Sequence, residues 1–128
     1  MKNNKNKPNN KFEAFLSWPA PEVSPNFRYG WEKSEARKEE RTVGFYEAEL
    51  SKDGFESFEG NASMLLEFFP KKNHIRDLDN LLSSMKHRID GICDSLKIND
   101  CQIKSVTLKL KDARPKNPGI HIVIKKSN

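Results

Sequence analysis

Three aspartates are the residues of this chain whose type and spacing best suit chemistry. Asp77 and Asp79 are separated by one residue at the start of a helical pattern, and Asp100 follows the end of that pattern. Carboxylates that converge repel one another unless a cation holds them, and hard oxygen ligands suit Mg²⁺ or Mn²⁺. Such an ion activates water for attack on a phosphodiester and stabilises the leaving oxygen. These three residues are therefore candidate catalytic and metal-binding residues of a nuclease.

The same acids also have a purely structural interpretation. A DxDN sequence at a helix start usually supplies an N-cap and a solvated acid, and an isolated aspartate such as Asp100 is a common turn residue. An EF-hand is disfavoured because Leu82 occupies the position that requires glycine. Spacing alone favours the helix-capping role, and a nuclease active site stays possible.

A lysine lies on the same predicted helix face as the second motif acid. At 100° per residue, Asp79, Ser83, Lys86 and Asp90 fall within about 60° of one another. A lysine beside the acids would neutralise the charge that develops on the attacked phosphate. Lys86 is therefore a fourth candidate catalytic residue.

The apolar pattern predicts the elements that position these side chains. The clearest periodicity covers residues 77–96 and predicts one helix with Asp77 as its N-cap. A second helix is predicted from residue 31 to about residue 51. Alternating or compact apolar segments predict four strands, the last two with one buried face each: residues 12–18, 62–69, 106–110 and 120–124.

Together these elements predict a single α+β domain in the order β-α-β-α-β-β, with a small mixed β-sheet packed against two main helices. Residues 1–11 are polar and basic, which predicts a disordered tail, so the domain is expected to cover residues 12–128. If the strand after Asp100 packs beside the strand that ends at Pro70, the third aspartate returns to the neighbourhood of the other two.

The composition favours a polyanionic partner and disfavours several other classes of protein. The formal net charge is +5, which suits nucleic acid but is equally compatible with simple solubility. No apolar run approaches the roughly 20 residues of a membrane span. Cys93 and Cys101 lack the spacing of zinc ligands, so we expect buried thiols in a cytoplasmic protein. The apolar fraction of 35% predicts a thin core, which favours a homodimer.

Two separated segments resemble the RusA family of Holliday junction resolvases, crossover junction endodeoxyribonucleases of bacteria and their prophages. The first is RDLDNLLSSMKHRIDGICDSLKINDCQI (residues 76–103), which is similar to the DLDN helix of the family and its closing acidic turn. The second is PAPEVSPNFRYGW (residues 19–31), which is similar to a loop before the first helix of many members. The resemblance implies a homodimeric, Mg²⁺-dependent endonuclease that nicks opposing strands of a four-way DNA junction during recombination and repair, with Asp77, Asp79 and Asp100 as the acids.

The chain departs from the family pattern at the cationic partner of these acids. The best-known members carry a lysine four residues after the second motif aspartate, where this chain has Ser83. Lys86, Asp90 and Gly91 instead resemble the pattern of a phage-associated branch. Asn99 also replaces an aspartate that the motif leads one to expect.

DNA contacts are expected mainly from residues that flank the acids. Arg76, Lys71 and Lys72 are placed to neutralise phosphates, and Arg28 and Asn26 in the proline-rich loop are the next candidates. Two alternatives remain: a non-catalytic DNA-binding phage protein, and a nuclease of broader specificity for branched or flapped DNA. We expect Mn²⁺ to substitute for Mg²⁺, and neither a small-molecule cofactor nor a membrane partner is expected.

Overall fold

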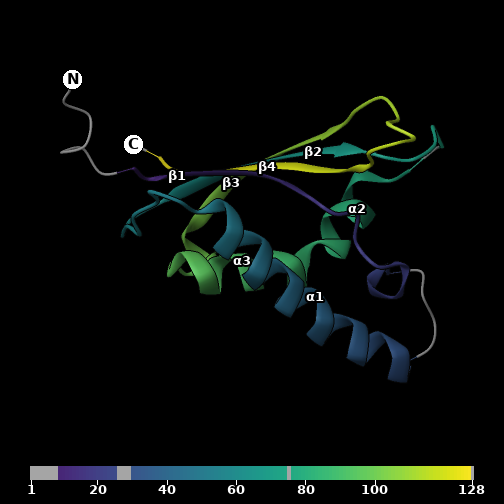
Figure 1. Ribbon diagram of the computed structural model, residues 1–128, viewed down its shortest axis with the longest axis horizontal. Helices are drawn as coiled ribbons and strands as arrows, with labels where there is room; N and C mark the ends of the chain where they lie inside the picture. Colours follow the sequence, from purple (N-terminus) through teal and green to yellow (C-terminus); the bar gives the residue numbers. More distant parts are fainter. Residues whose placement is uncertain (1–8, 26–29, 75, 128) are drawn as a thin grey trace.

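The computed structural model describes residues 9–25, 30–74 and 76–127, without the side chains of residues 30–32. Figure 1 shows a sheet with its helices gathered on one side. The elements are β1 (Lys11–Leu16), the 3₁₀ turn η2 (Pro21–Val23), α1 (Gly30–Ser51), β2 (Ala62–Phe69), α2 (Leu78–Ser84), α3 (Lys86–Leu96), the 3₁₀ turn η3 (Asp100–Gln102), β3 (Ile103–Leu110) and β4 (Gly119–Lys126).

The four strands form one mixed sheet in the order β1-β4-β2-β3. β4 pairs antiparallel with both β1 and β2, whereas β2 and β3 are parallel. The predicted α+β class, with a small mixed sheet and strands and helices in the predicted order, is confirmed.

Alternation along the strands places the core on the helix side of the sheet. Phe12 and Leu16 of β1 and Ile120, Ile122 and Ile124 of β4 are almost completely buried, while their sequence neighbours point to the opposite face. α1 and α3 cover the apolar face. Among the described residues, no helix combines the length and apolarity that crossing a bilayer requires.

The helix predicted over residues 77–96 is two helices that meet at Met85, so the prediction of one uninterrupted helix was wrong. Met85 has φ −93° and ψ −4°, and its N–H bonds to the carbonyls of Leu82 and Ser83. This tightened turn contains no proline or glycine, so the sequence carries no local signal for the break. Met85 is fully buried, which ties the junction to the core.

β3 is an edge strand and does not have the buried face that its alternation predicted. None of its residues is buried, and Val106 and Leu110 are 42% and 39% exposed. An edge strand has a hydrogen-bonded neighbour on one side only, and the side chains of β3 are more exposed than those of β2 and β4. Apolar side chains therefore remain at the surface along this edge.

The first strand begins at Lys11, inside the segment that was predicted to be a tail. Asn10 donates a side-chain hydrogen bond to the carbonyl of Glu56, and its own carbonyl accepts from the N–H of Lys126. Asn9 accepts from the N–H of Glu56. Residues 9–11 therefore pack with the domain, and residues 1–8 lie outside the described residues.

α1 and α3 approach each other closely at two glycines. A Cβ atom at Gly91 would lie 1.9 Å from the backbone oxygen of Arg41, and one at Gly44 would lie 2.1 Å from the backbone oxygen of Arg88. In both cases the obstacle is backbone, which cannot rotate away. The close packing of α1 against α3 therefore requires residues without a side chain at both positions.

We expect Gly91→Ala to lower the free energy of unfolding by about 1–3 kcal/mol or more. Alanine favours a helix by up to about 1 kcal/mol over glycine, but separating two packed helices costs more. Urea denaturation of the variant measures the change, with the exposed helical Ser83→Ala as the matched control. A Gly91→Ala protein as stable as the wild type would mean that the helices separate without cost.

Candidate functional site

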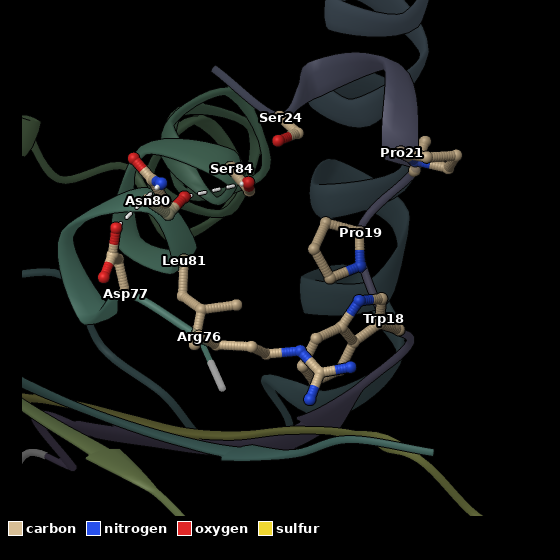
Figure 2. Close-up of a pocket in the computed structure, with 10 residues that line it drawn as sticks. Trp18, Pro19, Pro21, Ser24, Arg76, Asp77, Asn80, Leu81 and Ser84 are labelled. Atoms are coloured by element: carbon tan, nitrogen blue, oxygen red, sulfur yellow. Dashed lines mark hydrogen bonds between the residues drawn. The ribbon is translucent and has the colours of Figure 1, made fainter. Parts of the chain in front are cut away.

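An open cavity of about 400 Å³ lies beside the first motif acid. One wall comes from the start of α2 and the other from the chain between β1 and η2, as Figure 2 shows. The residues that line it are Trp18, Pro19, Ala20, Pro21, Ser24, Arg76, Asp77, Asn80, Leu81 and Ser84. Apolar rings, an arginine, an amide and a carboxylate therefore share one surface.

Asp77 occupies the N-cap position of α2, as predicted, but its side chain makes no capping hydrogen bond. Its backbone carbonyl accepts from Leu81, and its carboxylate accepts from the Asn80 amide at 3.4 Å. Asp77 and Asp79 are both exposed. Neither carboxylate is buried or used to cap the helix, so both are available to a ligand.

Asp100 does not join the other two acids within one chain. β3 packs beside β2, as the prediction required, but the strands are parallel, with Ala62 beside Ile103 and Phe68 beside Leu110. Asp100 precedes β3 and Asp77 follows β2, so a pairing about 20 Å long lies between their ends. The expectation that this strand returns Asp100 to the motif acids was therefore wrong.

Asp100 instead lines a second cavity of about 340 Å³ at the far end of α3. Its neighbours there include Asp90, Asp94 and Arg41, and the Arg41 guanidinium binds the Asp94 carboxylate at 2.8 Å and 3.1 Å. Within residues 9–25, 30–74 and 76–127, no three His, Cys, Asp or Glu side chains are grouped to hold a metal ion. One chain therefore does not offer Asp77, Asp79 and Asp100 as ligands of one ion.

The two cysteines have opposite surroundings. Cys93 is buried, and burial, followed by the nearby charges of Asp100, Asp90 and Asp94, raises the pKa of its thiol to about 12. Cys101 is exposed in η3, so the prediction of buried thiols holds for Cys93 and was wrong for Cys101.

Lys86 is exposed and is the first residue of α3. Because the helix breaks at Met85, the projection that placed Lys86 on one face with Asp79 does not apply to the folded chain. Ser83, at the family's usual lysine position, is also exposed. The role of Lys86 therefore stays a prediction.

Arg76 is the predicted DNA contact that lies in the cavity. Its guanidinium carbon is 5.6 Å from the centre of the Trp18 ring, and the guanidinium donates to the carbonyl of Lys72 at 2.9 Å. Lys71 and Lys72 are exposed beside it. The other two predicted contacts, Asn26 and Arg28, lie outside the described residues.

A buried arginine that sequence reasoning missed holds one wall of the cavity. Arg88 is 1% exposed and binds Glu40 through two nitrogens at 3.0 Å. It also donates to Glu47 at 2.9 Å and to the carbonyl of Ser17 at 2.8 Å. Glu40 in turn accepts from the N–H of Ala20, 3.4 Å away. The arginine thus joins α1 and α3 to the chain that carries Trp18.

Comparison with models of known protein families and with curated proteins finds no match to this chain.

The face of the sheet opposite the helices carries a second polar cluster. His121 contacts Glu67 through Nδ1 at 2.7 Å and Glu13 through Nε2 at 2.5 Å. The hydrogen bonds to Glu67 and Glu13 raise the pKa of His121. The hydrogen bond to His121 lowers the pKa of each glutamate.

These shifts predict how stability depends on pH. The contribution of His121 is fully present below its unfolded pKa of about 6.5 and is lost as the pH rises through the raised folded value. We therefore expect the free energy of unfolding to fall as the pH rises above about 6.5 and through the raised pKa of the folded protein, by less in His121→Gln than in the wild type. Urea denaturation across this range is the measurement, and equal pH profiles would contradict the prediction. The glutamates act oppositely, since their contribution is lost as the pH falls below about 4.5.

Proposed function

We propose that this chain is a Mg²⁺-dependent endodeoxyribonuclease that resolves four-way DNA junctions by paired, symmetric nicks. The observation that carries the proposal is that two exposed carboxylates, Asp77 and Asp79, lie one residue apart at the start of α2, and that Asp77 lines an open cavity together with Arg76 and Trp18. An exposed acid pair with a neighbouring cation suits a phosphodiester, since a metal ion bridges carboxylate and phosphate oxygens. The resemblance of residues 76–103 to the RusA family supports the same substrate.

A second copy of the chain supplies the third acid in this proposal. β3 is an open edge, and pairing two β3 strands antiparallel about a two-fold axis would continue the sheet. In that arrangement the start of one β3, preceded by Asp100, lies beside the end of the other, where α2 begins. The exposed apolar residues Leu78, Val106 and Leu110 support a partner at this edge, because pairing would cover them.

The metal ion belongs to this two-chain site and not to one chain. Asp77 and Asp79 of one copy and Asp100 of the other would hold Mg²⁺ or Mn²⁺, and a bound ion of this kind supplies an activated water and a charge opposite the leaving oxygen. The chain's own contribution is to hold both acids exposed at the start of α2 and to place Arg76 beside Asp77 in the cavity. Two such sites related by a two-fold axis match the two nicks that a four-way junction requires.

The decisive experiment incubates the protein with a synthetic four-way junction and Mg²⁺ or Mn²⁺. We expect paired symmetric nicks, and Asp79→Asn should reduce their rate by about a hundredfold or more while binding persists. Asp53→Asn, an exposed aspartate in the turn after α1, is the matched control and should cut normally. Binding should weaken steeply with salt, because phosphate contacts release counterions.

Other outcomes separate the alternatives. Tight binding without cleavage in either metal would identify a non-catalytic DNA-binding protein and refute the nuclease. Equal cutting of flaps and duplex ends would indicate a nuclease of broader structural specificity. Cleavage that survives Asp79→Asn unchanged would remove the motif acids from the mechanism.

A further inference from the structure

We propose that the cavity between α2 and η2 binds the base of one unstacked nucleotide. The inference deepens the proposed function and rests on it for the nature of the ligand, which is DNA. The proposed nuclease site contacts only phosphates, whereas this cavity would contact a base. Its starting point is the shape and lining of the cavity in Figure 2.

The walls of the cavity suit a flat, largely apolar group. Trp18 contributes an indole ring, Pro19 and Pro21 contribute pyrrolidine rings, and Leu81 faces them from α2. The volume of about 400 Å³ lies within the range of cavities that hold small organic molecules. Stacking on an aromatic side chain is the usual way in which proteins hold an unpaired base.

The polar groups of the cavity suit the edge of a base. The Asn80 amide donates one long hydrogen bond of 3.4 Å to the Asp77 carboxylate. Its oxygen and its second N–H are left for a ligand. The indole N–H of Trp18 makes no hydrogen bond within the described part of the chain. Asparagine amides pair well with the donor and acceptor patterns of bases.

The tryptophan wall is held in place before any ligand arrives. Trp18 packs edge-on against Phe68, with ring centres 6.1 Å apart. On its amino-terminal side, the carbonyl of Ser17 accepts from the buried Arg88. A wall fixed in this way loses little freedom when a ligand binds, which favours affinity.

The cavity also lies where a distorted strand would pass. Asp77 lines it, and Arg76 lies over the Trp18 ring with its guanidinium directed into the same space. A base held between these walls would place its own phosphate beside Arg76 and the acids. The cavity is therefore expected to set which nucleotide lies next to the cut.

The test compares two single-stranded octamers with the same backbone charge. One is oligo(dT), and the other carries abasic residues throughout. In a Trp31→Phe protein, whose remaining tryptophan is Trp18, we expect the octamer with bases to bind about tenfold more tightly than the abasic one. It should also quench the tryptophan emission, whereas the abasic octamer should not.

Variants in the same Trp31→Phe background locate the effect. Asn80→Ala leaves the rings of Trp18, Pro19 and Pro21 in place. It should reduce the differences in affinity among oligo(dA), oligo(dC) and oligo(dT). Trp18→Ala should abolish the advantage of the octamer with bases, and circular dichroism checks that it folds. Tyr46→Ala removes an exposed aromatic ring from α1, away from the cavity, and should change nothing.

The outcomes distinguish this inference from the proposed function. Equal affinity and equal quenching by both octamers would refute the base-binding site even if the protein cuts four-way junctions. A base-dependent advantage that Trp18→Ala abolishes would support the site even if no junction is cut. Junction cleavage with Mg²⁺, measured in parallel on the same protein, reports on the proposed function alone.

Discussion

Replacing Arg88 with methionine should lower the free energy of unfolding by about 3–5 kcal/mol. The substitution keeps an unbranched side chain of similar length but leaves the buried Glu40 carboxylate without the guanidinium that binds it. Because small domains are stable by only about 5–15 kcal/mol, this is a large part of the total. Urea denaturation followed by circular dichroism is the measurement.

The chain provides a matched control in a second arginine pair. Arg41 binds Asp94 with similar two-point geometry, but the two side chains are 55% and 45% exposed. Arg41→Met should therefore cost less than about 1 kcal/mol. Similar losses in the two variants would show that burial does not decide the strength of these pairs.

The buried pair also predicts the effect of removing both partners. In Arg88→Met combined with Glu40→Leu, no buried charge is left unpaired, so part of the lost stability should return. The bonds from Arg88 to the carbonyl of Ser17 and to the half-buried Glu47 are still missing in that protein, so recovery should be incomplete. A double variant less stable than Arg88→Met would contradict this account.

Mixing two inactive variants should restore cleavage if the acids come from different copies. Asp79→Asn and Asp100→Asn each damage both sites of their own homodimer. A mixed dimer combines both substitutions in one site and leaves the other site intact. If subunits exchange freely, half of the dimers are mixed, and roughly a quarter of the wild-type number of sites should be active.

The measurement is the rate of single nicks in a four-way junction, since a mixed dimer has one working site. The two proteins should be unfolded together and refolded to ensure exchange, and each variant alone is the control. An inactive mixture would place all three acids of a site in the same copy. The proposed two-chain site would then be wrong.

Local patterns predicted the elements of the fold well. The compact apolar run of residues 62–69 corresponds to β2 without change, and the helix predicted from residue 31 to about residue 51 begins one residue earlier, at Gly30. These elements follow from periodicity and chain breakers within short windows, which is information that the sequence carries directly. The alternation of β3 correctly predicted a strand, but alternation does not determine whether other elements cover that strand.

The site was harder to predict because its geometry depends on distant parts of the chain. The direction of β3 relative to β2 decides where Asp100 lies, and no residue near Asp100 encodes that direction. Arg88 offered one signal, since it occupies a position between Met85 and Ile92 on the apolar face of the helix pattern. A charge at such a position implies a buried partner, but its partners Glu40 and Glu47 are more than 40 residues away in the sequence.

The contrast between the two cysteines gives the protein a built-in position for a spectroscopic probe. Cys93 is buried with a pKa of about 12, so its thiol stays protonated near neutral pH and reacts poorly with maleimides. Cys101 is exposed and adjoins Asp100. A spin label or fluorophore added to the unmodified chain would attach at Cys101. The separation of two such labels would then test the antiparallel pairing of two β3 strands, in which the labels lie at opposite ends of the paired strands.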